Sequence, residues 1–544
     1  MSAKRVENAA DLALSMVGLA ASALARPQTA VAHALRASQQ TLESLTGRGT
    51  LQPAKGDKRF RDPVWTSNPG YNALMQSYLA WSNAVSGWVD GLDVTARDKL
   101  RVRIATDLVT DALAPTNALL TNPAAMKVTL EQGGRNLVVG MRQFLSDMTA
   151  NGGLPSMVDK SKFEVGSDLA LTPGRVVYAE DHLELIQYAP TTAEVRARPV
   201  FIVPPQINKF YIWDLAPGRS IVEALVAEGH QVFIVSWKNP TESEAHWTLE
   251  SYVEALDRAT AVACDISGSP DLNLVGACSG GITAALLAAL WGARGVERAG
   301  SLSLFVAILD VSGAQDTSMG LFASFETLEL ARMLSRSKGV LAGKDLERAF
   351  AWLRPNDLIW SYWVNNYLIG EAPPAFDLLY WNADTTNLPA ALHSDMLQLI
   401  ETGGVTGEGG PTICGHALSL KDIRCDAYLM GGETDHITPW DGCYLTRAGL
   451  GGSSTFVLSQ SGHVQSLINP PGNPKARFLS NDGEHATPDA FLAGAETHAG
   501  SWWPHWHRWL DARGGDRIAA PKAVGSRRHR PSADAPGTYV RAAA

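Results

Sequence analysis

Cysteine is scarce in this chain, and its five cysteines do not form a recognisable set. They stand at positions 264, 278, 414, 425 and 443, an odd number without any C-x-x-C pair. Disulfide frameworks need paired cysteines and zinc sites need closely spaced ones, so the pattern argues against both. The sequence therefore predicts no metal site and fits a protein of the reducing cytoplasm.

Long apolar runs and an excess of positive charge are also lacking. No stretch of about 18 uncharged apolar residues occurs, which argues against a transmembrane helix. Lys and Arg number 46 against 55 Asp and Glu, and the resulting net charge of -9 gives no sign of nucleic-acid binding. The basic run from Arg527 to Arg530 is expected to be a solvated tail and not a binding patch.

The N-terminus has some features of a signal peptide. A basic start is followed by an apolar run from Leu12 to Ala25, which ends in small residues. However, Glu7 and Asp11 interrupt the basic region and the run is mostly alanine. We favour an amphipathic helix that packs on the protein or on an apolar surface. Residues 1–60 as a whole are predicted to be a poorly ordered arm.

The stretch LNLVGACSGGITAALL, residues 272–287, organises the rest of the chain. A short apolar strand turns sharply at Cys278 into a helix-forming run, with Gly276 and Gly280 two places to either side. This is the pattern of the nucleophile elbow of α/β-hydrolases, with cysteine where serine is usual. The glycines would let strand and helix approach closely. The alternative is a glycine-rich loop that holds a buried structural cysteine.

The elements around this elbow predict the domain organisation. Apolar residues at three- and four-residue steps predict a mainly helical domain over 61–175. Over 176–544, strands alternate with helices and predict the parallel sheet of an α/β fold, an α/β-hydrolase catalytic domain. The alternation stops after the predicted strand 302–309. The helical and aromatic segment at about 312–421 is expected to be a cap insertion.

Aromatic residues are frequent in the predicted cap. Trp360, Trp363 and Tyr367 lie at helical spacing. Such spacing favours core packing for each of them, while the wall of an apolar substrate site is the alternative.

An acid and a histidine follow the elbow in the order that this fold requires. Asp435 follows a predicted strand in GGETDHITPW, and His463 follows the next one in SQSGHVQS. His436, beside the acid, precedes the expected position and is interpreted as a local hydrogen-bonding residue. Cys278, Asp435 and His463 are therefore predicted to form a catalytic triad.

Each predicted residue has a chemical task. His463 would remove the thiol proton of Cys278, and Asp435 would hold the imidazole tautomer. The backbone N–H groups of Ser279 and Ile207 are predicted to form the oxyanion hole. Acyl exchange between a thioester and a thiol is nearly isoenergetic, so a cysteine nucleophile favours an acyltransferase without excluding a hydrolase.

These residues, together with several longer stretches, resemble the poly(3-hydroxyalkanoate) synthases. The similarity covers most of the chain from about Asn68 onward. No nucleotide motif competes, because Gly339–Lys344 lacks the P-loop spacing. The matching stretches are GACSGG at 276–281, VPPQINKFYIWDL at 203–215, VSWKNP at 235–240, LRPNDLIWSYWVNNYLIG at 353–370, FDLLYWNADTTNLPAALH at 376–393, GGETDHITPWDGCY at 431–444 and SGHVQSLINPPGNPKARF at 461–478.

The resemblance implies the polymerisation of (R)-3-hydroxyacyl-CoA with release of CoA. Cys278 would hold the growing chain as a thioester, His463 would be the base, and Asp435 would assist activation of the monomer's 3-hydroxyl. CoA is then part of the substrate and a leaving group, and no cofactor is implied. The stretch after His463 looks most like the single-subunit branch that prefers medium-length side chains.

The resemblance also implies a homodimer in the cytoplasm, associated with polyester granules, with granule contact through the N-terminal helical domain. Two other hypotheses are kept. One is a Cys-dependent thioesterase or acyltransferase that makes small products. The other is a non-catalytic granule-coat protein, for which Cys278→Ala would leave polymer accumulation unchanged.

Overall fold

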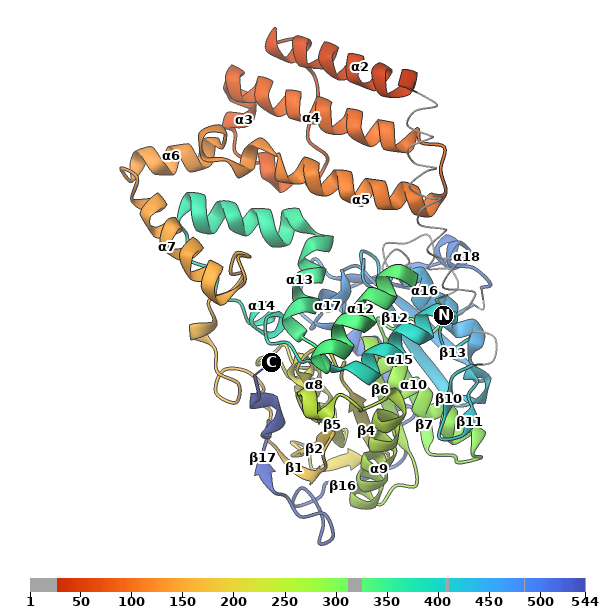
Figure 1. Cartoon of the computed structure of the whole chain (residues 1–544). Coiled ribbons are helices and arrows are strands. Elements are labelled where there is room, and N and C mark those ends of the chain that lie inside the picture. The colour runs from red at the N-terminus through yellow and green to blue at the C-terminus, as the bar shows by residue number, and fades with distance from the viewer. Residues whose placement is uncertain (1–26, 312–324, 407–409, 484, 544) are drawn as a thin grey trace. The chain divides into compact units, whose positions relative to one another are not determined.

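The structure is a computed structural model that describes residues 27–311, 325–406, 410–483 and 485–543 (Figure 1). These residues divide into two compact units. The first unit holds residues 27–160 together with Arg348–Phe376, and the second holds the remaining described residues from Ser161 onward. The predicted amphipathic helix at Leu12–Ala25 lies outside the described residues.

A large mixed sheet forms the centre of the second unit. Its middle strands, from β13 to β5, run parallel, and antiparallel strands extend it at both edges. In spatial order the described strands are β15 (Glu496–Ala499), β14 (Arg477–Ser480), β13 (Ser454–Ser459), β12 (Asp426–Gly432), β7 (Ala299–Phe305), β6 (Leu272–Ala277), β4 (Val200–Val203), β5 (Val232–Trp237), β2 (Leu183–Tyr188), β1 (Gly174–Ala179) and β17 (Ala533–Asp534).

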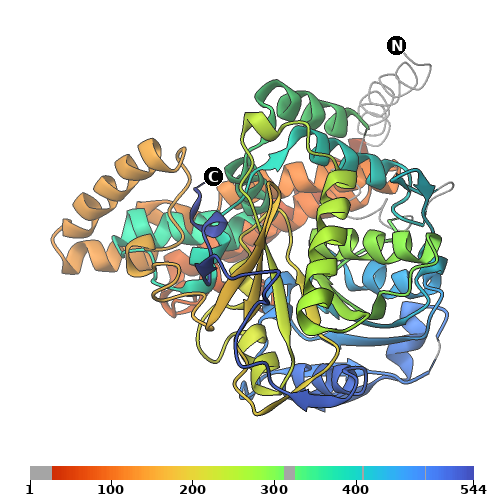
Figure 2. The same ribbon diagram turned by 90° about the horizontal axis from the view of Figure 1, so that it is seen from below.

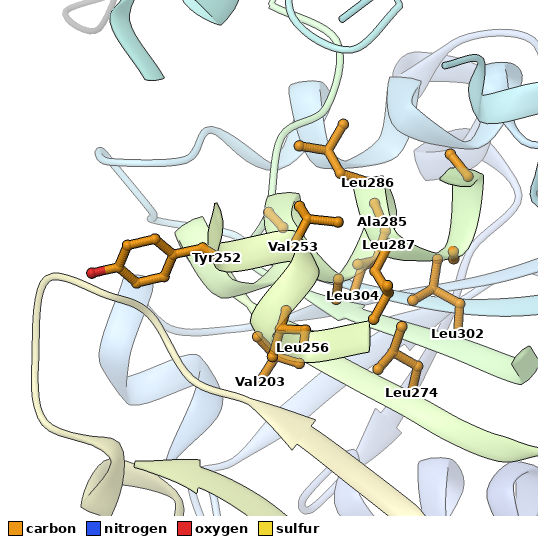
Figure 3. Packing of buried hydrophobic residues seen from close by; sticks show 14 of the residues in the cluster. Val203, Tyr252, Val253, Leu256, Leu274, Ala285, Leu286, Leu287, Leu302 and Leu304 are labelled. Atoms are coloured by element: carbon orange, nitrogen blue, oxygen red, sulfur yellow. The ribbon is translucent and has the colours of Figure 1, made fainter. Parts of the chain in front are cut away.

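Helices cover both faces of this sheet, so its central strands are buried on both sides. Along β4, Phe201 and Val203 face one apolar cluster, while Val200 and Ile202 face the other. The first cluster is closed by α9 (Leu249–Ser267) and α10 (Cys278–Ala293), as Figure 3 shows for Val203 and its neighbours. The second is closed by α8 (Ile221–Ala227) and α19 (Trp503–Asp511). Such two-sided burial is typical of parallel strands that read as continuous apolar runs.

The predicted strands and helices around the elbow are confirmed, with one difference in length. The strand predicted over 302–309 is β7, which begins at Ala299 and ends at Phe305. Val306 follows with a positive φ of 45°, and its N–H donates to Met430 O. Ala307 and Leu309 are buried in the core and Ile308 is partly buried against it, although all three lie outside the strand.

The segment predicted as a cap is helical, but its described residues divide between the two units. The first unit takes its aromatic middle, where Trp363 Nε1 donates to Asn117 O (3.0 Å) and Tyr367 stacks edge-on against Phe144. Core packing is thus confirmed for Tyr367, which is buried, while Trp360 and Trp363 are only partly buried. The described elements of the segment are α12 (Phe325–Lys338), β8 (Val340–Leu341), α13 (Gly343–Leu353), η8 (Asn356–Trp360), η9 (Trp363–Ile369), α14 (Asp377–Asn382), β9 (Leu388–Pro389), α15 (Ala390–Glu401), β10 (Thr412–Ile413) and β11 (His416–Ala417).

The first unit is helical, but its helices begin before residue 61, and residues 161–175 of the predicted helical domain belong to the second unit. Residues 27–45, within the predicted poorly ordered arm, form α2, which packs against α4. The alanines and other small side chains of α2 allow this contact. This pattern of small residues was a signal for the helix, but the low content of large apolar residues in the arm hid it. The helices are α2 (Pro27–Leu45), α3 (Val64–Ser67), α4 (Pro69–Asp90), α5 (Ala96–Ala112), α6 (Pro123–Glu131) and α7 (Arg135–Ala150).

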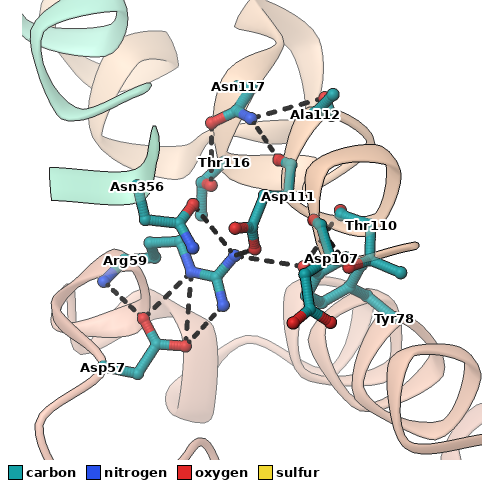
Figure 4. A network of polar contacts seen from close by, with 10 residues as sticks. All are labelled: Asp57, Arg59, Tyr78, Asp107, Thr110, Asp111, Ala112, Thr116, Asn117 and Asn356. Atoms are coloured by element: carbon teal, nitrogen blue, oxygen red, sulfur yellow. Dashed lines mark hydrogen bonds and ion pairs between the residues drawn. The ribbon is translucent and has the colours of Figure 1, made fainter. Parts of the chain in front are cut away.

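A polar network around Arg59 fixes the loop that precedes α3 (Figure 4). The guanidinium donates to Asp57, Tyr78, Asp111 and Asn356 at 2.9 to 3.4 Å. Burial acts against the charge of Arg59, but the hydrogen bond and charge of Asp57 with the other partners raise its pKa. Residues far apart in the sequence are thereby joined within the first unit.

The basic run at 527–530 is not a free solvated tail. His529 Nε2 lies 2.7 Å from Asp265 Oδ2 on α9, and Gly525 N donates to Gln187 on β2. The chain then pairs with β1 as strand β17, and Figure 2 shows this dark-blue C-terminal segment beside the yellow strands of the sheet. Within the described residues, no helix combines the length and apolar content needed to span a membrane.

Candidate active site

The strand β6 ends at Ala277, and α10 begins with Cys278 itself. Cys278 has a φ of 50°, a left-handed conformation that side chains with a Cβ seldom adopt. The predicted elbow is therefore present, and its strain falls on the reactive residue. Cys278 is partly exposed, and all five cysteines of the chain are free thiols.

The two glycines beside the elbow are required by close contacts. A Cβ on Gly276 would lie 2.7 Å from the Cα of Gly281, and one on Gly280 would lie 2.3 Å from Val203 O. These distances are shorter than any ordinary carbon contact. The glycines therefore let the first turn of α10 approach its own strand and the end of β4, as the sequence predicted.

Asp435 and His463 lie together at the same end of the sheet. Asp435 follows β12, and His463 is the first residue of the short helix α17 (His463–Leu467), which follows β13. His463 Nδ1 lies 2.7 Å from Asp435 Oδ2. The other ring nitrogen is thereby left for Cys278, whose thiol is close enough to contribute to the raised pKa of His463. The structure thus brings the three predicted triad residues into one chain of contacts.

Thr438 is a member of this site that the sequence analysis missed. Its hydroxyl donates to Asp435 Oδ2 (2.7 Å) and lies 3.0 Å from His463 Nδ1. The backbone N–H groups of Ile437 and Thr438 donate to the other carboxylate oxygen, Oδ1, at 2.8 and 2.9 Å. The sequence signal was the Asp-x-x-Thr spacing, which places a hydroxyl and two N–H groups around a carboxylate in a turn.

The proton of this pair is held strongly on the imidazole. Burial acts to lower the pKa of His463, but the charge and hydrogen bond of Asp435 and the hydrogen bond with Cys278 raise it to about 10. Burial likewise acts to raise the pKa of Asp435, whose side chain is wholly inaccessible, and the charge of His463 with the hydrogen bonds of His463 and Thr438 lowers it. The Asp435 carboxylate therefore stabilises the imidazolium that forms when His463 accepts a proton.

The predicted oxyanion-hole residues lie on two adjoining segments. Gln206 N donates to the hydroxyl of Ser279 (3.3 Å), and Gln206 Nε2 donates to Thr283 on α10 (2.8 Å). Ser279 is the second residue of α10, where the N–H has no acceptor within the helix. Among the described residues none accepts the Ile207 N–H. The loop after β4 is thus tied to the elbow next to both predicted donors.

Comparison with known proteins shows the family. Residues 56–225 match the model described as Poly-beta-hydroxybutyrate polymerase (PhaC) N-terminus, and residues 199–470 match the alpha/beta hydrolase fold. Poly(3-hydroxyalkanoate) polymerase 1 of Ectopseudomonas oleovorans is 44% identical over 97% of this chain and 94% of its own length. The chain belongs to the poly(3-hydroxyalkanoate) polymerase family.

Other relatives give the same result. Polymerase 2 of E. oleovorans is 45% identical over 97% of this chain and 94% of its own length. The polymerase subunit PhaC of Cupriavidus necator is 40% identical over 90% of this chain and 83% of its own length. Among solved structures, a monoacylglycerol lipase from Paleococcus ferrophilus is 15% identical, has a TM-score of 0.32, and covers 61% of this chain and 98% of its own. The chain of this polymerase family member has the predicted α/β-hydrolase fold.

A second cysteine of this family member, Cys443, lies near the site but is unsuited to be the nucleophile. It is 1% exposed, and its Sγ contacts Thr438 O at 3.8 Å. Burial and the charge of Asp435 raise its pKa well above the ordinary value, so it stays a thiol. Cys278, partly exposed on its strained turn, is the better nucleophile.

One other cluster offers metal-ligating atoms. Glu250 and Glu254 on α9 and Cys414 place one ligand atom each within 4.8 Å of one another. The Cys414 N–H and thiol already contact the two carboxylates, at 2.6 and 3.6 Å. These contacts account for the cluster without a metal ion.

Proposed function

We propose that this protein polymerises (R)-3-hydroxyacyl-CoA into poly(3-hydroxyalkanoate), with release of CoA, through an acyl thioester on Cys278. The observation that carries the proposal is the contact chain from Cys278 to His463 to Asp435, at a strained elbow in a chain of the polymerase family. A cysteine nucleophile keeps the acyl group energised for transfer to an alcohol.

In the proposed first step, the proton of the Cys278 thiol moves to His463, and the thiolate attacks the acyl-CoA carbonyl. The new carbon–sulfur bond forms to Cys278 as the bond to CoA breaks. His463 then gives its proton to the departing CoA thiolate. Between the attack of the thiolate and the departure of CoA, the carbonyl oxygen carries a negative charge. It would then accept hydrogen bonds from the N–H groups of Ser279 and Ile207.

In the proposed second step, the 3-hydroxyl of a monomer attacks the acyl–Cys278 carbonyl and gives its proton to His463. An ester bond forms, the bond to Cys278 breaks, and His463 returns its proton to the Cys278 sulfur. The chain, longer by one unit and still a CoA thioester, then returns to Cys278 by the first step with release of CoA. Asp435 assists through His463, because its own side chain is fully inaccessible and its carboxylate oxygens are engaged by His463, Thr438 and Ile437. Its assistance is then electrostatic, by holding the imidazolium that forms.

We further propose a preference for side chains of medium length, from the resemblance of the sequence after His463 to that branch. A homodimer and association with the polyester granule are proposed on the same resemblance. Contact with the granule through the first unit is supported by its apolar surface. On α7 alone, four large apolar side chains are each more than half exposed: Val138, Met141, Leu145 and Met148.

The test is CoA release from (R)-3-hydroxyacyl-CoA of about four to twelve carbons by the purified protein and by Cys278→Ala. We expect release with formation of high-mass polyester, best with the longer substrates, and neither in the variant. Release with only free hydroxy acid would point to a thioesterase. Polymer accumulation that is unchanged in Cys278→Ala would instead favour the non-catalytic granule-coat protein.

A further inference from the structure

The loop that carries Ile207 is held by a segment far along the chain. This loop runs from the end of β4 through Lys209 into the short helix η5 (Phe210–Trp213). Ile207 O accepts from Thr386 N at 3.1 Å, and Lys209 O accepts from Trp381 Nε1 at 2.7 Å. The carbonyl groups of the loop are thereby fixed, while the Ile207 N–H is left for an oxyanion.

Lys209 ties the same loop to the C-terminal residues. Its side chain is 3% exposed, and its Nζ donates to Ala542 O at 2.6 Å. Burial lowers the pKa of Lys209, against the nearby charge of Asp384. A buried ammonium is costly without partners, so the contact with a main-chain carbonyl is part of what keeps this side chain in place. Burying an ammonium two residues from Ile207 requires an explanation beyond packing, since a methionine would fill the space at lower cost.

Asn239 makes a second contact of this kind from the end of β5. Its Nδ2 donates to Ala543 O (2.6 Å), and its Oδ1 accepts from Asn387 N (2.9 Å). Asn239 is 6% exposed. It therefore joins the C-terminal residues to the same 381–387 segment that holds the carbonyl groups of the Ile207 loop.

The C-terminal segment is itself anchored on the sheet. The carboxylate of Glu184 on β2, 4% exposed, accepts from the N–H groups of Thr538 and Tyr539 and from the Thr538 hydroxyl. Val540 is 2% exposed within the apolar cluster that also holds η5. Residues 538–543 thus form a fixed bridge from β2 to Lys209 and Asn239.

We propose that residues 538–543 position the oxyanion-hole loop, with Lys209 and Asn239 as the positioning residues that transmit the contact. The proposal rests on the proposed role of the Ile207 N–H. None of these residues touches the reacting atoms. They fix the position of the Ile207 N–H, whose hydrogen bond to the substrate oxygen becomes stronger as negative charge develops on that oxygen in the transition state. Loss of these residues therefore lowers kcat and leaves substrate binding nearly unchanged.

The test compares Lys209→Met and a chain without residues 542–544 with the matched control Lys99→Met. Lys99 on α5 belongs to the first unit, and its Nζ likewise donates to a main-chain carbonyl, Asp90 O, at 2.9 Å. In CoA release we expect kcat to fall roughly tenfold to hundredfold in both altered proteins, with KM within about twofold. Lys209→Arg, which keeps a cationic donor, should recover part of kcat.

Two further measurements separate positioning from general damage. Alkylation of Cys278 by iodoacetamide needs no oxyanion hole, so its rate should stay within about twofold of the control. Amide hydrogen exchange across residues 204–213 should become faster in Lys209→Met and stay unchanged in Lys99→Met.

The outcomes distinguish this proposal from the function itself. Unchanged kcat with a lower melting temperature, or alkylation that falls in parallel with kcat, would overturn the positioning role. Absence of CoA release from the unaltered protein would reject the proposed function. The hydrogen-exchange comparison would then still decide the inference, since unchanged exchange in residues 204–213 contradicts it and faster exchange supports it.

Discussion

Thr438 Oγ1 lies 3.0 Å from His463 Nδ1 while it donates to Asp435 at 2.7 Å, so one hydroxyl contacts both the acid and the histidine of the predicted triad. The two carboxylate oxygens of Asp435 are divided between this pair and the backbone of Ile437 and Thr438. Orientation of the imidazole therefore depends on a residue that is not itself a member of the triad.

Replacement of Thr438 should weaken this arrangement. In Thr438→Val, Asp435 loses one donor, its pKa rises, and its hold on the His463 proton declines. We expect kcat for CoA release to fall by roughly tenfold, since a network hydrogen bond to a charged group is worth about 1.5–3 kcal/mol. Thr438→Ser keeps the hydroxyl and should stay within about threefold of the unaltered protein. Equal losses in both variants would show that the methyl group matters and the hydroxyl does not.

The raised pKa of His463 predicts how its contribution to stability depends on pH. Its folded pKa of about 10 exceeds the ordinary value of 6.5, so the stabilisation is complete below about pH 6.5 and is lost as pH rises towards 10. The pKa of Asp435 is lowered, so its contribution is present above about pH 4 and declines in acid. The melting temperatures of the unaltered protein and His463→Gln should therefore differ most at about pH 5–6 and converge towards pH 10. A difference that grows with pH would contradict the assignment of this proton.

The sequence predicts the centre of the fold and the triad, because each follows from short-range patterns. Cys278 stands on a strand, turn and helix that continuous apolar residues and two glycines define locally. Asp435 and His463 follow from chain order in the fold. Periodicity also indicates the parallel strands, because their burial on both faces gives uninterrupted apolar runs.

What the sequence does not predict depends on contacts between distant segments. The bridge from Lys209 to Ala542 joins residues more than 300 positions apart, and neither residue belongs to a motif. The end of β7 at Phe305 depends on a left-handed turn at Val306, although the apolar run continues. Residues 27–45 fall within the predicted poorly ordered arm, yet they form a helix that packs along α4. In each case tertiary packing overrides the local pattern.

The elbow should not tolerate a side chain at Gly280. A Cβ there would lie 2.3 Å from Val203 O and 2.5 Å from Pro204 O, both backbone atoms that cannot turn away. Gly280→Ala is expected to cost about 1–3 kcal/mol of stability and to displace the first turn of α10, with loss of most CoA release. Gly91→Ala is the control, because its φ is −76° and its nearest neighbours would lie at 3.5 Å. Full activity and an unchanged melting temperature in Gly280→Ala would refute the close approach of α10 to the end of β4.

The exposed side of α7 should hold the enzyme on its polymer. Val138, Met141, Leu145 and Met148 recur at steps of three and four residues, which places them on one face, each 52–57% exposed. The opposite side holds Asn136, Gly140 and Asp147, which are buried, and Asp147 accepts from Tyr367 of η9. Folding thus leaves this apolar face without a partner among the described residues. An exposed apolar patch of this kind is typical of an interaction surface.

In Leu145→Gln combined with Met148→Gln, we expect a several-fold smaller fraction of enzyme to sediment with preformed poly(3-hydroxyalkanoate), because each change removes about 1.5–3 kcal/mol of apolar burial. CoA release with soluble substrate should be unchanged. Leu334→Gln on α12, where the leucine is 53% exposed, is the matched control and should sediment normally. If the double variant instead sediments fully and changes its molecular mass in solution, the face serves contact between copies of the chain and not the polymer.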